Sequence, residues 1–403
     1  MEDKSKILLA KRTERVQESA TLAMAQKALE LQQKGIDVIS LSLGEPDFNT
    51  PESIKMAAIE AVEKNYSHYS PVSGFLSLKQ AICQKLKRDN HLDFLPEQIV
   101  VANGAKQALY QIFQVLIDEQ DEVILPAPYW VSYATLAQIS GANLKVVNCE
   151  MEQNFKISPE QLAAAITPKT KLFVLNSPSN PTGAVYSQAE IEALAEVLKK
   201  HPQIWILSDE IYEYIRFTDK KHFSIAQIPE FKSRVLLVHG VSKGYAMTGY
   251  RIGFSATPTF IAKACTALQS QISSGACSVA QKAAEKAFNL SEDIAEDMRN
   301  TFKKRRDLAV QILQSIPGLE LQTPEGAFYL FPRIKQFFGK KFENYHIQNS
   351  KDLCLYLLDQ AHVAMVDGES FGAQDYVRLS YAIDEKKLEQ ACQHIKNALL
   401  KLY

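Results

Sequence analysis

Short apolar segments alternate with helical patterns through the middle of the chain. Segments typical of buried strands occur at QIVVANGA, DEVILPAP, LKVVNC, TKLFVLNSP, QIWILSDE and RVLLVHG. Stretches with helical spacing lie between them, such as KQALYQIFQVLI, WVSYATLAQISG and SQAEIEALAEVLKKH. This alternation predicts a mostly parallel sheet with helices on both faces. In such a sheet, the loops that leave the carboxyl ends of the strands converge on one edge, where ligands bind.

The segments before this region predict helices and one strand. ATLAMAQKALELQQKG has helical spacing and ends at Gly35, a residue type that caps helices. IDVISLSLG alternates like a strand, and helices are expected over 52–64 and 76–89.

The C-terminal part has a different pattern. A helix-rich region after Cys265 ends at Gln314, and short strand-like segments follow at GAFYLFP, VAMVDGESFG and DYVRLSYA, before the terminal helix DEKKLEQACQHIKNALLKLY. We therefore expect a large α/β domain over 49–310. A smaller, discontinuous α+β domain would comprise 1–48, with an N-terminal arm, and 311–403.

The composition is that of a soluble globular protein with about two domains. The chain has 403 residues, of which 45 are basic and 46 acidic, a net charge of −1. This balance argues against nucleic acid as a partner, and no apolar run approaches the roughly 20 residues of a membrane span. Six scattered cysteines and a charged start, MEDKSKILLAKRTER, predict a cytoplasmic protein with free thiols. The eight histidines do not cluster, so no metal site is expected.

A lysine follows the last apolar strand of the predicted sheet. Lys243 lies in VSKGYAMTGYRIGF, shortly after RVLLVHG, and Arg251 follows eight residues later. A cation at the end of a buried strand costs free energy unless something uses it. A lysine that extends its amine to solvent is the simpler alternative, and this stretch alone does not decide between the two.

Other predicted strands also end in polar side chains. QIVVANGAKQAL places Ala105 and Lys106 at the start of a helix, where backbone N–H groups and the helix dipole favour an anion. LFVLNSPSNPTGAV holds Asn180 in a turn stiffened by proline and glycine. QIWILSDEIY places Asp209 after a strand and Tyr212 three residues later. The simpler alternatives are an ordinary turn, a surface loop and an N-cap aspartate.

These groups favour one cofactor. Hydride transfer with a dinucleotide would call for GxGxxG, and serine hydrolysis for GxSxG, and neither motif occurs. A lysine, a carboxylate and an anion cradle at one sheet edge suit pyridoxal 5′-phosphate. The lysine forms a Schiff base with this cofactor, and the carboxylate keeps its pyridine nitrogen protonated.

Five motifs in order resemble one family. NGAKQAL, SPSNPTG, SDEIYE, SKGYAMTGYRIG and YVRLSYA together resemble class I aminotransferases of pyridoxal-phosphate fold type I. The resemblance runs from about Arg15 to the C-terminus and is closest to the bacterial aspartate and aspartate/prephenate aminotransferases. It implies a three-layer large domain with a mostly parallel sheet, a smaller α+β domain, and a homodimer with shared active sites.

The resemblance also implies the cofactor contacts. Lys243 would form the Schiff base and then move the proton from the substrate Cα, and Asp209 would pair with the ring nitrogen. The other implied contacts are Tyr212 and Asn180 at the phenolic oxygen, Arg251, Ala105, Lys106 and Ser242 at the phosphate, Trp130 stacked on the ring, and Tyr69 at the phosphate of the neighbouring subunit.

For the substrate, the resemblance implies that Arg378 grips the α-carboxylate with help from Gly44 and Asn180, and that Trp130 lies beside it. Some relatives bind a distal carboxylate with an arginine from the partner subunit, but this chain has no arginine between Arg251 and Arg299. Lys106 and Thr21 are the candidates for that role.

The implied activity is transfer of an amino group between L-aspartate and 2-oxoglutarate by a ping-pong mechanism, giving oxaloacetate and L-glutamate. Lysine is a less selective anion partner than arginine, so transfer to prephenate or from aromatic amino acids stays open. A lyase of the same fold is a further alternative. A regulator fused to a DNA-binding domain is disfavoured, because the N-terminal segment is too short for such a domain.

Overall fold

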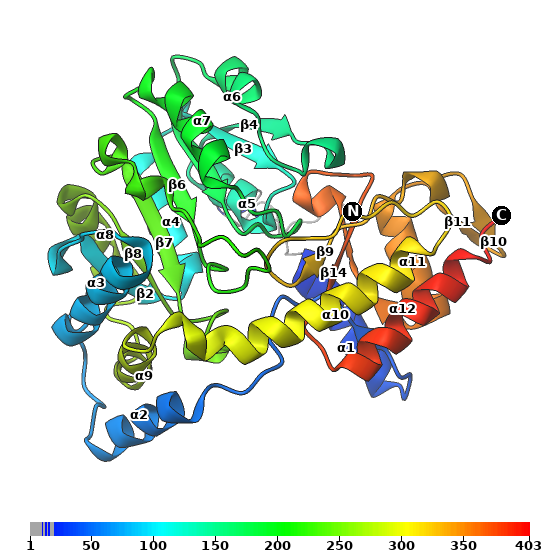
Figure 1. The fold of residues 1–403 in the computed structure, drawn as a ribbon, viewed down its shortest axis with the longest axis horizontal. Coiled ribbons are helices and arrows are strands. Elements are labelled where there is room, and N and C mark those ends of the chain that lie inside the picture. Colours follow the sequence, from blue (N-terminus) through cyan, green and yellow to red (C-terminus); the bar gives the residue numbers. More distant parts are fainter. Residues whose placement is uncertain (1–9, 11–12, 14, 17–19) are drawn as a thin grey trace.

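A seven-stranded sheet forms the centre of the protein, which we describe from a computed structural model over residues 10, 13, 15, 16 and 20–403 (Figure 1). The sheet order is β2-β8-β7-β6-β5-β3-β4. Its strands are β2 (Ile99–Asn103), β3 (Glu122–Ala127), β4 (Asn143–Asn148), β5 (Thr170–Asn176), β6 (Trp205–Asp209), β7 (Val235–Gly240) and β8 (Ile252–Ala256). Most of the expected N-terminal arm, including much of MEDKSKILLAKRTER, lies outside the described residues.

The sheet is mostly parallel, as the sequence predicted. β3 pairs in parallel with β4 and β5, and β6 pairs in parallel with β5 and β7. β8 is antiparallel to both of its neighbours, β7 and β2. β8 was not predicted from the sequence, because its short run IGFSA follows a turn-rich stretch directly instead of a helix.

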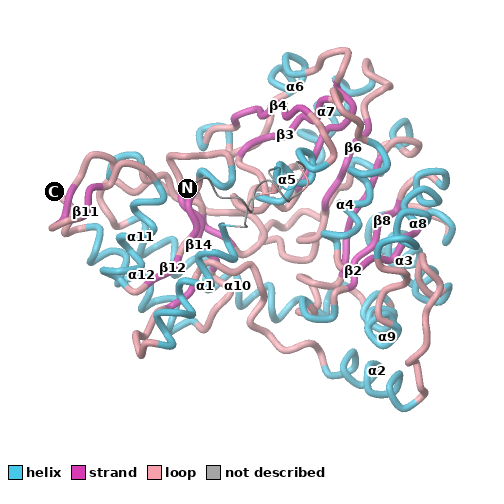
Figure 2. The backbone as a smooth tube through the Cα atoms, turned by 180° about the vertical axis from the view of Figure 1, so that it is seen from behind, coloured by secondary structure: helices cyan, strands magenta, loops and turns pink. Residues whose placement is uncertain are grey.

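Strand alternation divides the side chains of the sheet between two cores. In β5, Leu172 and Val174 pack into one core, and Phe173 and Leu175 into the other, because successive strand side chains point to opposite faces. The first core is covered by α4 (Ala105–Leu116), α5 (Val131–Ile139) and α8 (Thr259–Ile272). The second is covered by α3 (Leu76–Asn90), α7 (Gln188–Lys199) and α9 (Ser278–Phe288), and α2 (Glu52–Glu63) packs on α9 (Figure 2). The result is the expected three-layer α/β architecture.

A second group of elements combines the two ends of the described chain. β14 (Val377–Ser380) pairs antiparallel with β13 (Val366–Asp367) and β9 (Tyr329–Leu330). β1 (Ile39–Ser40), shorter than the strand expected in IDVISLSLG, pairs in parallel with β12 (Val363–Ala364). The remaining elements here are α1 (Ala20–Gln33), which packs on β12 and β13, α11 (Ser350–Ala361), α12 (Glu385–Leu399) and the hairpin of β10 (Lys341–Phe342) and β11 (Tyr345–His346).

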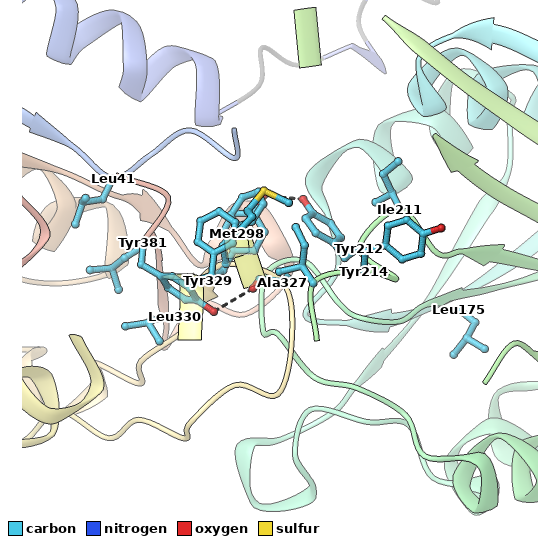
Figure 3. Packing of buried hydrophobic residues seen from close by; sticks show 14 of the residues in the cluster. Leu41, Leu175, Ile211, Tyr212, Tyr214, Met298, Ala327, Tyr329, Leu330 and Tyr381 are labelled. Carbon is cyan, nitrogen blue, oxygen red and sulfur yellow. Dashed lines mark hydrogen bonds between the residues drawn. The ribbon is translucent and has the colours of Figure 1, made fainter. Parts of the chain in front are cut away.

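One long helix and one shared core join the two groups. α10 (Glu296–Gln314) runs from beside the large sheet to the C-terminal elements, where it packs on α12 (Figure 1). The core between them contains Tyr212, from the loop after β6, and Tyr329, from β9 (Figure 3). A membrane-spanning helix would require a longer apolar stretch than any helix among residues 20–403 provides.

Candidate active site

A cavity of about 310 Å³ lies at the carboxyl edge of the large sheet. The pairing register places the ends of β2, β5, β6 and β7 on this edge, together with the start of β8. Of the residues that the sequence analysis assigned to the site, the structure brings twelve together around this cavity: Thr21, Gly44, Ala105, Lys106, Trp130, Asn180, Asp209, Tyr212, Ser242, Lys243, Arg251 and Arg378. Tyr69 does not line it.

Lys243 reaches the cavity from the end of a fully buried strand. β7 ends at Gly240, where an added Cβ would lie 2.8 Å from the Cα of Gly253 in the neighbouring strand, so the two strand ends approach closely. The Lys243 amine donates a hydrogen bond to the carbonyl oxygen of Gly44. Burial lowers the pKa of Lys243 to about 8, while the nearby Glu45 carboxylate acts in the opposite direction. The simpler alternative, an amine extended to bulk solvent, does not describe this lysine.

Asp209 is the last residue of β6 and is 3% exposed. The residues after it form a turn and not a helix, so it is not an N-cap aspartate. Its Oδ1 accepts a hydrogen bond from the Ile211 N–H at 3.2 Å, and its Oδ2 accepts one from the Tyr133 hydroxyl at 2.6 Å. Burial raises the pKa of Asp209 to about 6, and the Tyr133 hydrogen bond opposes this rise.

The start of α4 forms a cradle for an anion. Gly104 precedes the helix with φ 80° and ψ 162°, a conformation that essentially only glycine adopts. A Cβ there would lie 2.3 Å from Nη2 of Arg251, so the guanidinium packs directly on the glycine. Arg251 is held in place by donating from Nη1 to the carbonyl oxygen of Thr248 at 2.9 Å. Backbone N–H groups of the first helical turn and a guanidinium therefore face the same space.

Lys106 and Trp130 form the adjoining wall. The Lys106 amine lies 5.1 Å from the centre of the Trp130 ring, within cation–π range. Burial, together with the positive charge of Arg251, lowers the pKa of Lys106. Thr21, in the first turn of α1, and Ser242 also line the cavity.

Arg378 enters the cavity from β14. It is 1% exposed, so the alternative of a surface strand residue is wrong for this side chain. Its Nη1 donates to Asn180 Oδ1 at 3.0 Å, and its Nη2 donates to the carbonyl oxygen of Ser42. Nε is buried and has no hydrogen-bond partner among the described residues. Within the described part of the chain, no carboxylate forms an ion pair with this guanidinium, so its free donor is suited to bind an anionic ligand.

The cavity is also lined by polar residues that were not assigned from the sequence, among them Tyr329 and Asn176. Tyr329 shares a hydrogen bond of 2.7 Å between hydroxyl groups with Tyr212, and its ring lies 4.6 Å from the Arg378 guanidinium. Asn176 Oδ1 accepts a hydrogen bond from the backbone N–H of Asn180 at 2.9 Å. Asn176 stands in the same motif as Asn180 and could have been found there. Tyr329 lies in GAFYLFP, which carries no signal other than that of a strand.

Tyr69 is 97% exposed and lies on the segment between α2 and α3. Its position is therefore compatible with a role outside its own chain. Within the described residues, histidine, cysteine, aspartate and glutamate side chains form no group of three that could hold a metal ion.

Comparisons with known proteins agree with one another over nearly the whole chain. Residues 36–395 match the family described as aminotransferase class I and II. An aspartate/prephenate aminotransferase of Cereibacter sphaeroides is 44% identical, covering 95% of this chain and 96% of that protein. A probable aspartate/prephenate aminotransferase of Rickettsia bellii is 47% identical over 95% of this chain and 96% of its own length.

Solved structures give the same result. The aspartate aminotransferase of Rhizobium meliloti superposes with a TM-score of 0.94 at 40% identity, covering 98% of this chain and 99% of that chain. The aspartate aminotransferase of Thermus thermophilus, solved with maleate, superposes with a TM-score of 0.90 at 36% identity, covering 97% of this chain and 99% of that chain.

Proposed function

Because the chain belongs to the class I and II aminotransferases, we propose that it transfers the amino group of L-aspartate to 2-oxoglutarate, giving oxaloacetate and L-glutamate. The observation that carries this proposal is a single cavity that contains both Lys243 and the buried Arg378. An amino acid held by its α-carboxylate at Arg378 is thereby placed in the same cavity as a lysine amine. The proposal thus assigns Lys243 to chemistry at the substrate Cα.

The residues of the cavity fit pyridoxal 5′-phosphate as cofactor. Gly104 has no side chain to block the cradle at the start of α4, and Arg251 supplies a cation to a phosphate there. Asp209 would pair with the pyridine nitrogen, Trp130 would stack on the ring, and Asn180 and Tyr212 would face its phenolic oxygen. Lys243 would hold the cofactor covalently. When bound, this cofactor takes up the electron pair released as the Cα–H bond breaks.

The chain itself supplies binding, orientation and proton transfer. Arg378 binds the α-carboxylate, helped by the Asn180 amide and the backbone at Gly44, and this fixes the direction of the Cα–H bond. The Lys243 Nζ removes the proton from Cα, and its lowered pKa favours the neutral amine that this step needs. Tyr212 and Tyr329, joined by their hydroxyl groups, form a wall of the cavity that belongs to both groups of elements.

We propose that Lys106 and Thr21 bind the distal carboxylate of the substrate. Both line the cavity, and the Lys106 amine is the cation beside Trp130. The names of the relatives from Cereibacter sphaeroides and Rickettsia bellii include both aspartate and prephenate, so prephenate is the second candidate substrate. Maleate, bound to the Thermus thermophilus relative, is a dicarboxylate like aspartate and supports the first.

The proposal includes a cytoplasmic homodimer with shared active sites. Support for a dimer comes from the fully exposed Tyr69 and from apolar residues exposed on the neighbouring α2, namely Met56, Ile59 and Val62. None of the six cysteines forms a disulfide in the described part of the chain, which fits a reducing compartment. We also propose the division into a large domain over 49–310 and a small domain comprising 1–48 and 311–403. α10 crosses this boundary without a break.

A donor and acceptor panel with purified holoenzyme tests the proposal. Aspartate with 2-oxoglutarate is expected to give oxaloacetate and glutamate in parallel-line kinetics typical of a ping-pong mechanism. Glutamate with prephenate is the comparison. If transfer from glutamate to prephenate is far faster than transfer from aspartate, the proposed substrate is wrong although the reaction class stands. Product formed from aspartate without consumption of the oxo acid would indicate a lyase instead.

A lysine variant is the control for the chemistry. Lys243→Ala protein should neither absorb as a Schiff base nor transfer amino groups, because among the described residues Lys106 is the only other lysine that lines the cavity. Lys106→Ala protein should keep the Schiff-base absorbance. The reverse result would move the covalent role from one lysine to the other.

A further inference from the structure

A buried tyrosine lies beside the carboxylate at the end of β6, where it also contributes to the lining of the cavity. Tyr133 stands in α5, is 2% exposed and packs in the core that α4, α5 and α8 share with the sheet. Its hydroxyl donates to Asp209 Oδ2 at 2.6 Å, a short hydrogen bond to a charged acceptor. The distance between the two residues along the chain is 76 positions, so the contact exists only in the folded sheet.

Few other groups stabilise the ionised form of the Asp209 carboxylate. Burial and the neighbouring Glu210 both favour the protonated form of Asp209. The groups that favour the charged form are the Tyr133 hydroxyl, the Ile211 N–H at 3.2 Å and the more distant Lys243 amine. Tyr212 also faces this region and interacts with the Tyr133 hydroxyl. Among the side chains of residues 20–403, Tyr133 is the one that donates a hydrogen bond directly to the carboxylate.

The same tyrosine contacts the aromatic wall of the cavity. Trp130 directly precedes α5, and its ring meets the ring of Tyr133 edge to face, with centroids 5.3 Å apart and an angle of 85°. Residues three apart at a helix start lie on the same side. A single helical turn therefore positions both the ring that would stack on the cofactor and the hydroxyl that holds Asp209.

We propose that Tyr133 is a positioning residue that keeps the Asp209 carboxylate ionised and fixed in orientation toward the cavity. The proposal rests on the proposed function, since the ionised carboxylate matters only if it pairs with a protonated pyridine nitrogen. A phenol with a merely structural role could donate equally well to a backbone carbonyl. Here it donates to the group with which the cofactor ring would pair.

The variant Tyr133→Phe isolates this hydroxyl. It removes one oxygen and keeps the ring in its core position, so the fold is retained. The hydroxyl donates to the charged form of Asp209, and its loss increases the proton affinity of the carboxylate. We expect the acidic limb of the pH profile of kcat/KM to move up by about one pH unit, and the dissociation constant of pyridoxal 5′-phosphate to rise about tenfold.

Tyr356→Phe is the matched control. Tyr356 is also fully buried, and its hydroxyl donates to a backbone carbonyl, that of Ala398, at 2.8 Å. It lies on α11, among the C-terminal elements and outside the cavity lining. Both variants lose one buried hydrogen bond, so both should lose stability to urea. Only Tyr133→Phe should change the affinity for pyridoxal 5′-phosphate and the acidic limb of the pH profile of kcat/KM.

A double variant makes the test independent of small changes in folding. If Tyr133 acts through the carboxylate, adding Tyr133→Phe to Asp209→Asn should change cofactor affinity less than about twofold. The inference is overturned if Tyr133→Phe and Tyr356→Phe have the same affinity and pH profile, or if the effect of Tyr133→Phe is undiminished in the Asp209→Asn protein. Failure of the cofactor assignment is recognised separately, because wild-type protein would then bind no pyridoxal 5′-phosphate, and the role of Tyr133 would fall with it. A different amino donor or acceptor would leave the inference about Tyr133 unchanged.

Discussion

Replacing Gly104 by alanine should have two effects that can be measured separately, one on the stability of the protein and one on its affinity for pyridoxal 5′-phosphate. At φ 80° and ψ 162°, the backbone of Gly104 lies in a region that costs a residue with a side chain about 1–3 kcal/mol. The new Cβ would also lie 2.3 Å from Nη2 and 2.9 Å from Cζ of Arg251. These atoms are the end of a flexible side chain, so the guanidinium can move aside. That movement carries it out of the cradle.

The two effects have different magnitudes and different assays. Urea unfolding of the cofactor-free Gly104→Ala protein should show a loss of about 1–3 kcal/mol, from the backbone strain. Titration with pyridoxal 5′-phosphate should show a dissociation constant raised about tenfold to a hundredfold, because a hydrogen bond to a charged group contributes about 1.5–3 kcal/mol.

Two other glycines serve as controls. Gly35 has φ +84° with no atom within 4 Å of an added Cβ, so Gly35→Ala introduces strain without a clash. Gly249 has neither the strained φ nor a neighbour within 4 Å, so Gly249→Ala should behave as wild type. If Gly104→Ala binds the cofactor as tightly as Gly35→Ala does, Arg251 does not hold the phosphate and the reasoning about the cradle is refuted.

Three further predictions concern Arg378, the buried ion pair between Lys85 on α3 and Glu213 after β6, and Lys243. Arg378→Lys loses the planar fork beside Asn180 and should lower kcat/KM for aspartate about tenfold to a hundredfold; an unchanged value would mean that the α-carboxylate binds elsewhere. Lys85→Met leaves the Glu213 carboxylate buried without its lysine partner, and the free energy of unfolding measured in urea should fall by about 3–5 kcal/mol. Adding Glu213→Gln should restore part of this loss. If the double variant shows no recovery, the pairing is contradicted. The pKa of Lys243 is lowered to about 8 in the folded protein, so above pH 8 the unfolded chain binds more protons at this lysine than the folded protein does. The cofactor-free protein should therefore gain stability as the pH rises from about 8 toward 10.5. An equal gain in Lys243→Met protein would show that other groups cause the rise.

The motifs at the strand ends show how much of the site could be predicted from local sequence patterns. The motifs that contain Ala105, Asn180, Asp209 and Lys243 each follow an apolar run, and the pairing register places all of these runs in one sheet with their carboxyl ends together. Parallel strands must end at the same edge, so the existence of a site could be inferred before any contact was known. The helices over 52–64 and 76–89 were likewise predicted within one residue of α2 and α3.

Other features depended on contacts between distant segments. Arg378 meets Asn180 across 198 positions, Tyr133 meets Asp209 across 76, and Lys85 on α3 is neutralised by Glu213 beyond β6. β8 had no helical crossover to mark it, and Tyr329 stood in a two-residue strand.

Most of the strands and helices, and the polar residues at the strand ends, could be predicted from the sequence, because hydrophobic periodicity and turn chemistry act over a few neighbouring residues. The tertiary structure alone decided which of those polar groups share hydrogen bonds, how deeply each is buried, and therefore how far the pKa values of Lys243 and Asp209 move. Desolvation and hydrogen bonding depend on atoms brought together from the whole chain, and no local window of residues contains that information.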